Sequence, residues 1–227
     1  MLRRQVVFGL FVLATLTLTF FARRSSTNPE LPPSGQGAVL SVTHDYWVET
    51  GRSFRGAGRA EKLLDEQMVI ARSGKLTTSA ELKVFSERMA DLYRESVQHC
   101  QRAVVEIERR SVQGVDPLAV AVATEAVNYL RVRINLHRDH AGDSGLYARL
   151  YADIEAAGGE IDPDTPEGKR FLEREEENLA RIKARHDGDG RKERELLDTV
   201  LAHARQARLE LVAKYNSDFP DFNSPAK

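Results

Sequence analysis

The sequence predicts an all-α protein, an elongated antiparallel helical bundle that follows a single N-terminal transmembrane helix. Three observations support this prediction. An apolar segment near the N-terminus is flanked by arginines, apolar residues farther along recur at spacings of three and four, and the alternation typical of strands is not visible. Aromatic residues make up only 7% of the chain, which suits helices packed through aliphatic side chains.

The expected transmembrane helix covers residues 6–22. These residues are apolar or hydroxylated, and they lie between two arginine pairs, Arg3-Arg4 and Arg23-Arg24. At about 1.5 Å per residue the segment spans about 26 Å, slightly less than a hydrocarbon core of about 30 Å. Because the arginine pairs balance, only the terminal amine favours an inside N-terminus, which places the rest of the chain on the periplasmic or extracellular side.

Three other interpretations of this segment stay open. A cleaved signal peptide would have Ala22 before the cut, but Phe20 is bulky for the position two residues earlier. A transit peptide agrees with the lack of acids in residues 1–29, although such peptides are amphipathic and residues 6–22 are apolar all round. A twin-arginine export signal would use Arg3-Arg4, but the rest of that pattern is missing.

Composition divides the chain into four regions. Residues 1–24 form the anchor or signal peptide, residues 25–37 a linker rich in Pro, Ser and Gly, residues 38–215 the helical bundle, and residues 216–227 a disordered tail. The segment FPDF at 219–222 is a candidate docking motif, for which a frayed terminus is the simpler interpretation.

The first part of the bundle, residues 38–73, is the least regular. Glycines at positions 51, 56 and 58 each weaken a helix by about 1 kcal/mol relative to alanine. We therefore expect a kinked helix with a break near Gly56–Gly58.

A long helix follows, and its start is marked by a capping box made of Thr78 and Glu81. Its buried seam is Leu82, Phe85, Met89, Leu92, Ser96, Cys100, Val104 and Ile107. Cys100 is the only cysteine, and its place on this seam predicts a small buried residue. An intermolecular disulfide in a dimer is the alternative.

Four further helices are expected. Asp116 followed by Pro117 is a cap and a first-turn proline, and it starts a helix over 116–142 that Gly142 ends. A shorter helix covers 145–157, another runs from Thr165-Pro166 to Gly188, and the last covers 189–215 with Asp189 as its cap.

The charge balance excludes one class of partner. The chain has 33 basic residues, four of which flank the apolar segment, and 34 acidic residues, so the remainder carries a small net negative charge. A nucleic-acid-binding protein normally has a strong basic excess. We therefore expect no nucleic-acid partner.

The densest group of potential metal ligands is His137, His140 and Asp143. Histidines three residues apart on a helix can face one ion, and the aspartate could join them. The simpler interpretation is that cations gather at a helix end near Gly142, where the helix dipole stabilises each by about 0.3–1 kcal/mol. Because no other element supplies a clear ligand, we expect no metal and no cofactor.

The same stretch contains two short matches to catalytic motifs. His137-Arg138-Asp139 matches the start of the kinase catalytic loop, but Ser144 stands where that loop needs asparagine. The segment GDSG at 142–145 matches the nucleophile loop of chymotrypsin-like proteases, whose chemistry is built on β-barrels. Since both matches lack their partner residues, enzymatic activity is the least favoured function.

Four basic residues recur at spacings of three, four and three near the membrane segment: Arg52, Arg55, Arg59 and Lys62. On a helix they would form one stripe that binds an anion, a lipid headgroup or an acidic partner. A solvated helix face is the simpler interpretation.

Taken together, these features predict a membrane-anchored helical scaffold or protein-interaction domain. Long seams at coiled-coil-like spacing favour docking of a protein partner or a second copy of the chain. The alternative is an extracytoplasmic sensory bundle that holds a small ligand between helices, near Trp47, Phe54, Tyr129 or Tyr147.

Overall fold

The computed structural model describes residues 33–158, 162 and 164–223. The regular structure in these ranges is entirely helical: α2 (Pro33–Ala57), the 3₁₀ turn η1 (Gly58–Ala60), α3 (Glu61–Arg72), α4 (Ser79–Glu108), α5 (Pro117–Ala156), α6 (Pro166–Arg185), the π-helical turn η2 (His186–Gly190) and α7 (Arg191–Tyr215). The all-α prediction is confirmed. The expected membrane segment, residues 6–22, lies outside the described residues, and no helix within them is long and apolar enough to cross a membrane.

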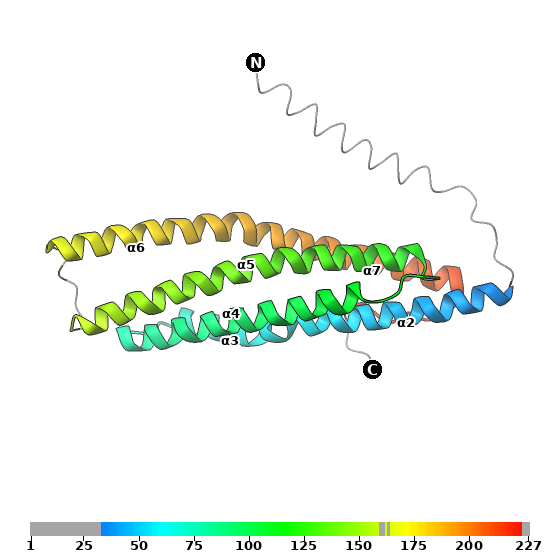
Figure 1. The fold of residues 1–227 in the computed structure, drawn as a ribbon, viewed down its shortest axis with the longest axis horizontal. Coiled ribbons are helices and arrows are strands. Elements are labelled where there is room, and N and C mark those ends of the chain that lie inside the picture. Colours follow the sequence, from blue (N-terminus) through cyan, green and yellow to red (C-terminus); the bar gives the residue numbers. More distant parts are fainter. Residues whose placement is uncertain (1–32, 159–161, 163, 224–227) are drawn as a thin grey trace, which may run out of the picture. The chain divides into compact units, whose positions relative to one another are not determined.

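Four helical rods pack together in the described part of the chain (Figure 1). The first rod is α2, η1 and α3, the second is α4, the third is α5, and the fourth is α6, η2 and α7. α4 has its most extensive contact with α5, α3 lies against α4, and α7 lies against α5. Successive rods run in opposite directions, as in an up-and-down bundle.

Two of the expected helix starts, at Thr78 and Asp116, are confirmed together with their caps. Thr78 Oγ1 accepts a hydrogen bond from the Glu81 N–H at 3.2 Å, and Glu81 Oε2 accepts one from the Thr78 N–H at 3.0 Å. Asp116 Oδ1 accepts a hydrogen bond from the Leu118 N–H at 2.9 Å, with Pro117 in the first turn. These caps satisfy backbone donors that have no partner inside the helix.

Asp116 also ties three rods together. Its N–H donates to Thr43 Oγ1 of α2 at 2.9 Å, while its Oδ2 accepts hydrogen bonds from Lys214 Nζ at 2.6 Å and Tyr215 Oη at 2.8 Å. Burial alone would raise the pKa of Asp116, but the hydrogen bonds from Lys214 and the Leu118 N–H outweigh it and lower the pKa. The carboxylate is therefore charged and fixes the start of α5 against α2 and the end of α7.

The apolar core is concentrated in one half of the bundle. A large cluster joins α2, the second half of α4, the first half of α5 and α7 around Trp47, Leu130 and Leu211. Cys100 is fully buried there, as its place on the α4 seam predicted. A second, much smaller cluster lies between α3 and α4 and consists of Leu64, Met89 and Leu92.

The expected helices over 116–142 and 145–157 are in fact one helix, α5, so the predicted end at Gly142 is wrong. Gly142 and Gly145 have open space around them, and neither adopts the left-handed conformation that ends helices. Asp143 is buried and forms ion pairs with Arg181 and Arg185 of α6. Tertiary contacts of this kind outweigh the weak helix propensity of glycine.

Alanine at these two positions tests the continuity of α5. We expect Gly142→Ala and Gly145→Ala each to raise the free energy of unfolding by about 0.5–1 kcal/mol, because a helical glycine loses more backbone entropy on folding than alanine. Chemical denaturation followed by circular dichroism measures this change. Gly158→Ala is the control and should destabilise, because Gly158 has a φ of 92°. A loss of stability in Gly142→Ala would contradict a continuous helix.

The expected break between the last two helices is also wrong. The residues predicted to separate them form η2, a π-helical turn that leads α6 directly into α7. The N-cap position of α7 is Gly190, which has right-handed helical angles, and no side chain accepts a capping hydrogen bond there. Asp189 therefore does not act as the predicted N-cap. Single π-helical turns inserted into α-helices are rare and often lie at functional sites.

The first rod agrees with the expected kink but not with the linker. α2 ends at Ala57 and gives way to η1, which confirms a break near Gly56–Gly58. However, α2 already begins at Pro33, so residues 33–37 of the predicted linker are helical. A proline in the first helical turn costs no hydrogen bond, which explains why the helix can start there.

The C-terminal tail is not disordered up to residue 223, which corrects the prediction for 216–227. Phe219 is fully buried and Phe222 is 3% exposed, and both belong to the main core cluster. Trp47 Nε1 donates to the Pro220 carbonyl at 2.8 Å, and the Trp47 ring packs edge-on against Phe222 with centroids 5.2 Å apart. The FPDF segment therefore docks on α2 of its own chain.

Candidate functional site

The four candidate basic residues do not form one helical stripe, because α2 ends between Arg55 and Arg59. Arg52 is exposed and pairs with Glu49 at 2.6 Å, and the exposed Lys62 lies 4.0 Å from Glu66 on α3. Arg55 is half-buried and donates from Nη1 to the Phe222 carbonyl at 2.6 Å. The structure therefore leaves Arg52 and Lys62 on the surface and turns Arg55 towards the tail.

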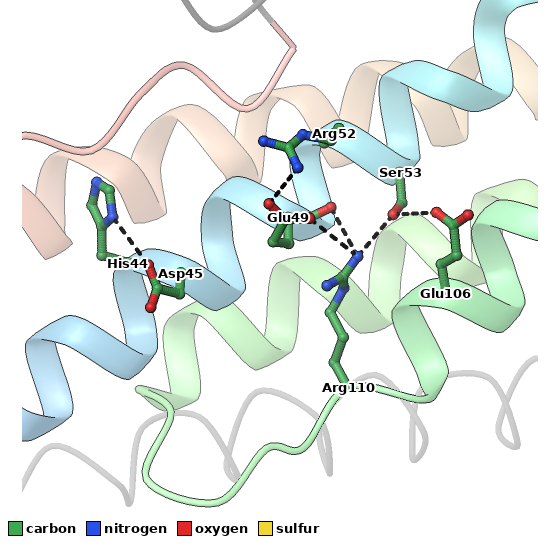
Figure 2. Close-up of polar contacts among 7 residues, drawn as sticks. All are labelled: His44, Asp45, Glu49, Arg52, Ser53, Glu106 and Arg110. Atoms are coloured by element: carbon green, nitrogen blue, oxygen red, sulfur yellow. Dashed lines mark hydrogen bonds and ion pairs between the residues drawn. The ribbon is translucent and has the colours of Figure 1, made fainter.

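A polar network runs along α2 beside Arg52 and joins α2 to the end of α4 (Figure 2). Ser53 Oγ donates to Glu106 Oε2 at 2.7 Å and accepts a hydrogen bond from Arg110 Nη2 at 3.1 Å. The same nitrogen of Arg110 lies 3.3 Å from the Glu49 carbonyl oxygen and 3.8 Å from its carboxylate. Since every member of this network pairs with another, its role is to hold α2 against α4.

A charged layer built on the buried Arg133, which the sequence did not predict, crosses the bundle near η1 and η2. Arg133 of α5 is 5% exposed, and its Nη1 donates to Tyr129 Oη at 2.8 Å and to Glu61 Oε1. Tyr129 Oη in turn donates to Glu193 Oε1 at 2.9 Å, and the Arg133 guanidinium lies 3.8 Å from the same carboxylate. Burial raises the pKa of Tyr129, so the hydroxyl stays protonated and can donate.

The two carboxylates of this layer come from the residues where the rods return to α-helical geometry. Glu61 is the first residue of α3, directly after η1, and Glu193 is the third residue of α7, directly after η2. The sequence does hold a signal for Arg133, because it lies three residues after buried Leu130 and four before buried His137. A charged residue on a buried helix face requires a partner.

A cavity of about 320 Å³ lies beside this layer. Its walls include two of the four aromatic residues nominated as ligand contacts, Phe54 and Tyr129, whose rings lie 5.7 Å apart. It also brings together Arg55 and Arg59 from the basic set. Trp47 instead packs under the tail, and Tyr147 stacks on Tyr151 at 6.3 Å.

The three weak metal candidates are placed on α5 with other partners. His137 Nδ1 lies 2.8 Å from Ser96 Oγ, Asp143 pairs with arginines of α6, and the His140 ring lies 5.1 Å from the ring of Tyr93. Within the described ranges, no group of three histidine, cysteine or acidic side chains is arranged to hold a metal ion. The same residues are not at a helix end, because α5 continues to Ala156.

His137 has an expected effect on pH dependence. Burial, with the nearby charge of Arg133, lowers the pKa of His137 to about 3. In the unfolded chain His137 binds a proton below about pH 6.5, whereas in the folded protein it stays neutral down to about pH 3. The free energy of unfolding therefore falls as the pH drops from about 6.5 towards 3. The loss is about 1.4 kcal/mol per pH unit from this residue. Denaturation at several pH values should show a shallower slope for His137→Phe than for the wild type, and equal slopes would contradict the prediction.

No family model, no curated protein and no solved structure matches this chain.

Proposed function

We propose that the protein is a membrane-anchored helical scaffold whose bundle pairs with a second copy of itself through a groove between α3 and α4. The groove has a volume of about 460 Å³ and is lined by Gln67, Ile70, Leu76, Ala80, Glu81, Val84, Phe85 and Arg88. We call it the α3–α4 groove. The N-terminal segment, residues 6–22, would hold each copy in the same membrane and so raise its local concentration.

The observation that carries this proposal is a cluster of exposed apolar side chains at the α3–α4 groove. Of the residues that line the groove, Val84 is 63% exposed and Ile70 40%. Val69 and Met68, which are 66% and 38% exposed, are the sequence neighbours of Ile70 on α3 and do not line the groove. The chain is otherwise rich in charge, with 30% Asp, Glu, Lys and Arg. A contiguous apolar patch on such a surface typically marks a protein–protein contact.

The charges at the rim of the groove favour a second copy over a different partner. Glu81 and Arg88 line the groove seven positions apart on α4, with Val84 and Phe85 midway between them. A two-fold axis through the midpoint would place Glu81 of one copy opposite Arg88 of the other, and Val84 opposite Phe85. Two-fold contacts of this self-complementary kind are the commonest in oligomers.

Sedimentation of the full-length protein in lipid nanodiscs or mild detergent tests the proposal. We expect a dimer that Val84→Glu converts to a monomer, whereas Val105→Glu, a 41% exposed position on the same helix, leaves the dimer intact. Arg88→Glu should weaken the dimer, because it would place two carboxylates opposite each other across the two-fold axis. A wild-type monomer at all concentrations, or a dimer that Val84→Glu does not affect, would overturn the proposal.

A further inference from the structure

The cavity beside the charged layer is amphipathic. One part of its wall is apolar and is formed by Phe54 of α2, Leu130 of α5, and Leu197 and Leu201 of α7. The charged part of the wall is formed by Arg55 and Arg59 at the junction of α2 and η1. Its volume of about 320 Å³ lies at the small end of the range for ligand sites, roughly 300–1,000 Å³.

Two of the three basic residues that line the cavity form no ion pair within the described part of the chain. Arg133 is paired with Glu61 and Glu193, so its charge is compensated. By contrast, no described carboxylate lies within ion-pair distance of Arg55 or Arg59; Arg55 donates to a backbone carbonyl, and the charge of Asp221 acts on it from farther away. Because the Glu61 carboxylate of the same wall is paired with Arg133, the two remaining guanidinium groups leave the cavity with a net positive charge that favours an anion.

A buried donor at the cavity wall also lacks a partner. Arg133 lines the cavity, and its Nε is buried without a hydrogen bond to any described atom. Leaving such a donor unsatisfied costs about 1–3 kcal/mol or more.

We infer that this cavity binds a small amphipathic anion, a carboxylate attached to a compact apolar group. The apolar group lies against Phe54, Leu130 and the leucines of α7, and the carboxylate is held by Arg55 and Arg59. The site belongs to a different surface from the α3–α4 groove, so it does not depend on the proposed self-association. The volume fits a monocarboxylate with a single ring better than a whole phospholipid.

Calorimetric titration of the full-length protein in nanodiscs with 3-phenylpropionate tests this inference, with empty nanodiscs as the blank. We expect saturable binding, at least tenfold weaker binding of the neutral analogue 3-phenylpropanol, and about tenfold weaker binding by Arg59→Gln. Arg52→Gln and Lys62→Gln are matched controls from the same basic set, and they should bind as the wild type does because neither residue lines the cavity.

Each of four results would overturn the inference. The first is the absence of saturable binding by the wild type, whose folding is verified by its thermal unfolding. The second is equal affinity for 3-phenylpropanol, which would indicate an apolar pocket without anion recognition. The third is an equal loss of affinity in Arg52→Gln and Arg59→Gln, which would indicate diffuse charge attraction rather than this cavity. Inorganic phosphate should not compete at equal concentration, and effective competition would contradict the role of the apolar wall.

Discussion

Phe219→Ala is expected to lower the free energy of unfolding by about 3–5 kcal/mol, the largest effect of any single truncation in the tail. Phe219 is fully buried, and its ring lies 5.4 Å from His44 and 6.3 Å from Trp47. Its carbonyl oxygen also accepts a hydrogen bond from Arg208 Nε of α7. Removal of the ring leaves a cavity where the tail joins α2 to α7, and the surrounding helices can fill it only in part.

Urea denaturation followed by circular dichroism measures this loss. The control is Phe171→Ala, which removes the same ring from a half-exposed position on α6 and should cost about 1 kcal/mol. Trp47 fluorescence provides a second readout, because a tail that leaves its place exposes the indole to water. A cost in Phe219→Ala no larger than that in Phe171→Ala would show that the tail is not docked.

Arg133→Ala is expected to destabilise the protein by a similar amount, about 3–5 kcal/mol, because it removes one partner from a buried ion pair. Without the guanidinium, the Glu193 carboxylate, whose side chain is only 15% exposed, loses its cationic partner, and Tyr129 loses one of its hydrogen bonds. The cost comes mainly from the unpaired carboxylate rather than from the attraction that is lost.

A second variant separates these two contributions. Arg133→Leu combined with Glu193→Gln removes the guanidinium and the more buried of its two carboxylate partners, and should recover much of the stability that Arg133→Ala loses. Arg131→Ala is the matched control, since Arg131 is exposed on the same helix and its ion pair with Glu108 at the surface contributes about 1 kcal/mol or less. If Arg133→Ala costs no more than Arg131→Ala, the charged layer does not stabilise the bundle.

The caps were predictable because they depend on neighbours in the sequence. Each cap satisfies helix-end donors that lie within a few residues of it, namely Thr78 with Glu81 for α4 and Asp116 before Pro117 for α5. These hydrogen bonds do not depend on contacts with distant parts of the chain. The kink near Gly56–Gly58 has the same local origin, because two glycines only two positions apart weaken a helix by their backbone entropy. Local chemistry therefore indicated both the helical class and most helix starts.

The continuity of the rods was not predictable in this way. Gly142 and the turn at His186–Gly190 resemble helix ends in the sequence, yet both lie within rods that continue. At Gly142, the neighbouring Asp143 pairs with arginines of α6, a contact with residues about 40 positions away. Whether a glycine ends a helix depends on such contacts, which propensity does not include.

The candidate sites also depend partly on the local sequence and partly on the packing of distant segments. The sequence placed Arg55 and Arg59 on a helix face, but only the packing of α2, α5 and α7 brings them to one cavity with Phe54 and Tyr129. The sequence also gave no reason to join Arg133 to Glu61 and Glu193, which lie on three different rods.

The sequence by itself determined that the described chain is helical, where α4 and α5 begin, where the first rod kinks, and that Cys100 is buried on a seam. Only the tertiary structure decided that the tail docks under Trp47, that the rods run through their glycines, and that a charged layer crosses the bundle. The physical reason is the range of the interactions. Caps and helical periodicity act within one or two turns, whereas burial of Phe219 and pairing of Arg133 arise only when segments far apart in the chain exclude water together.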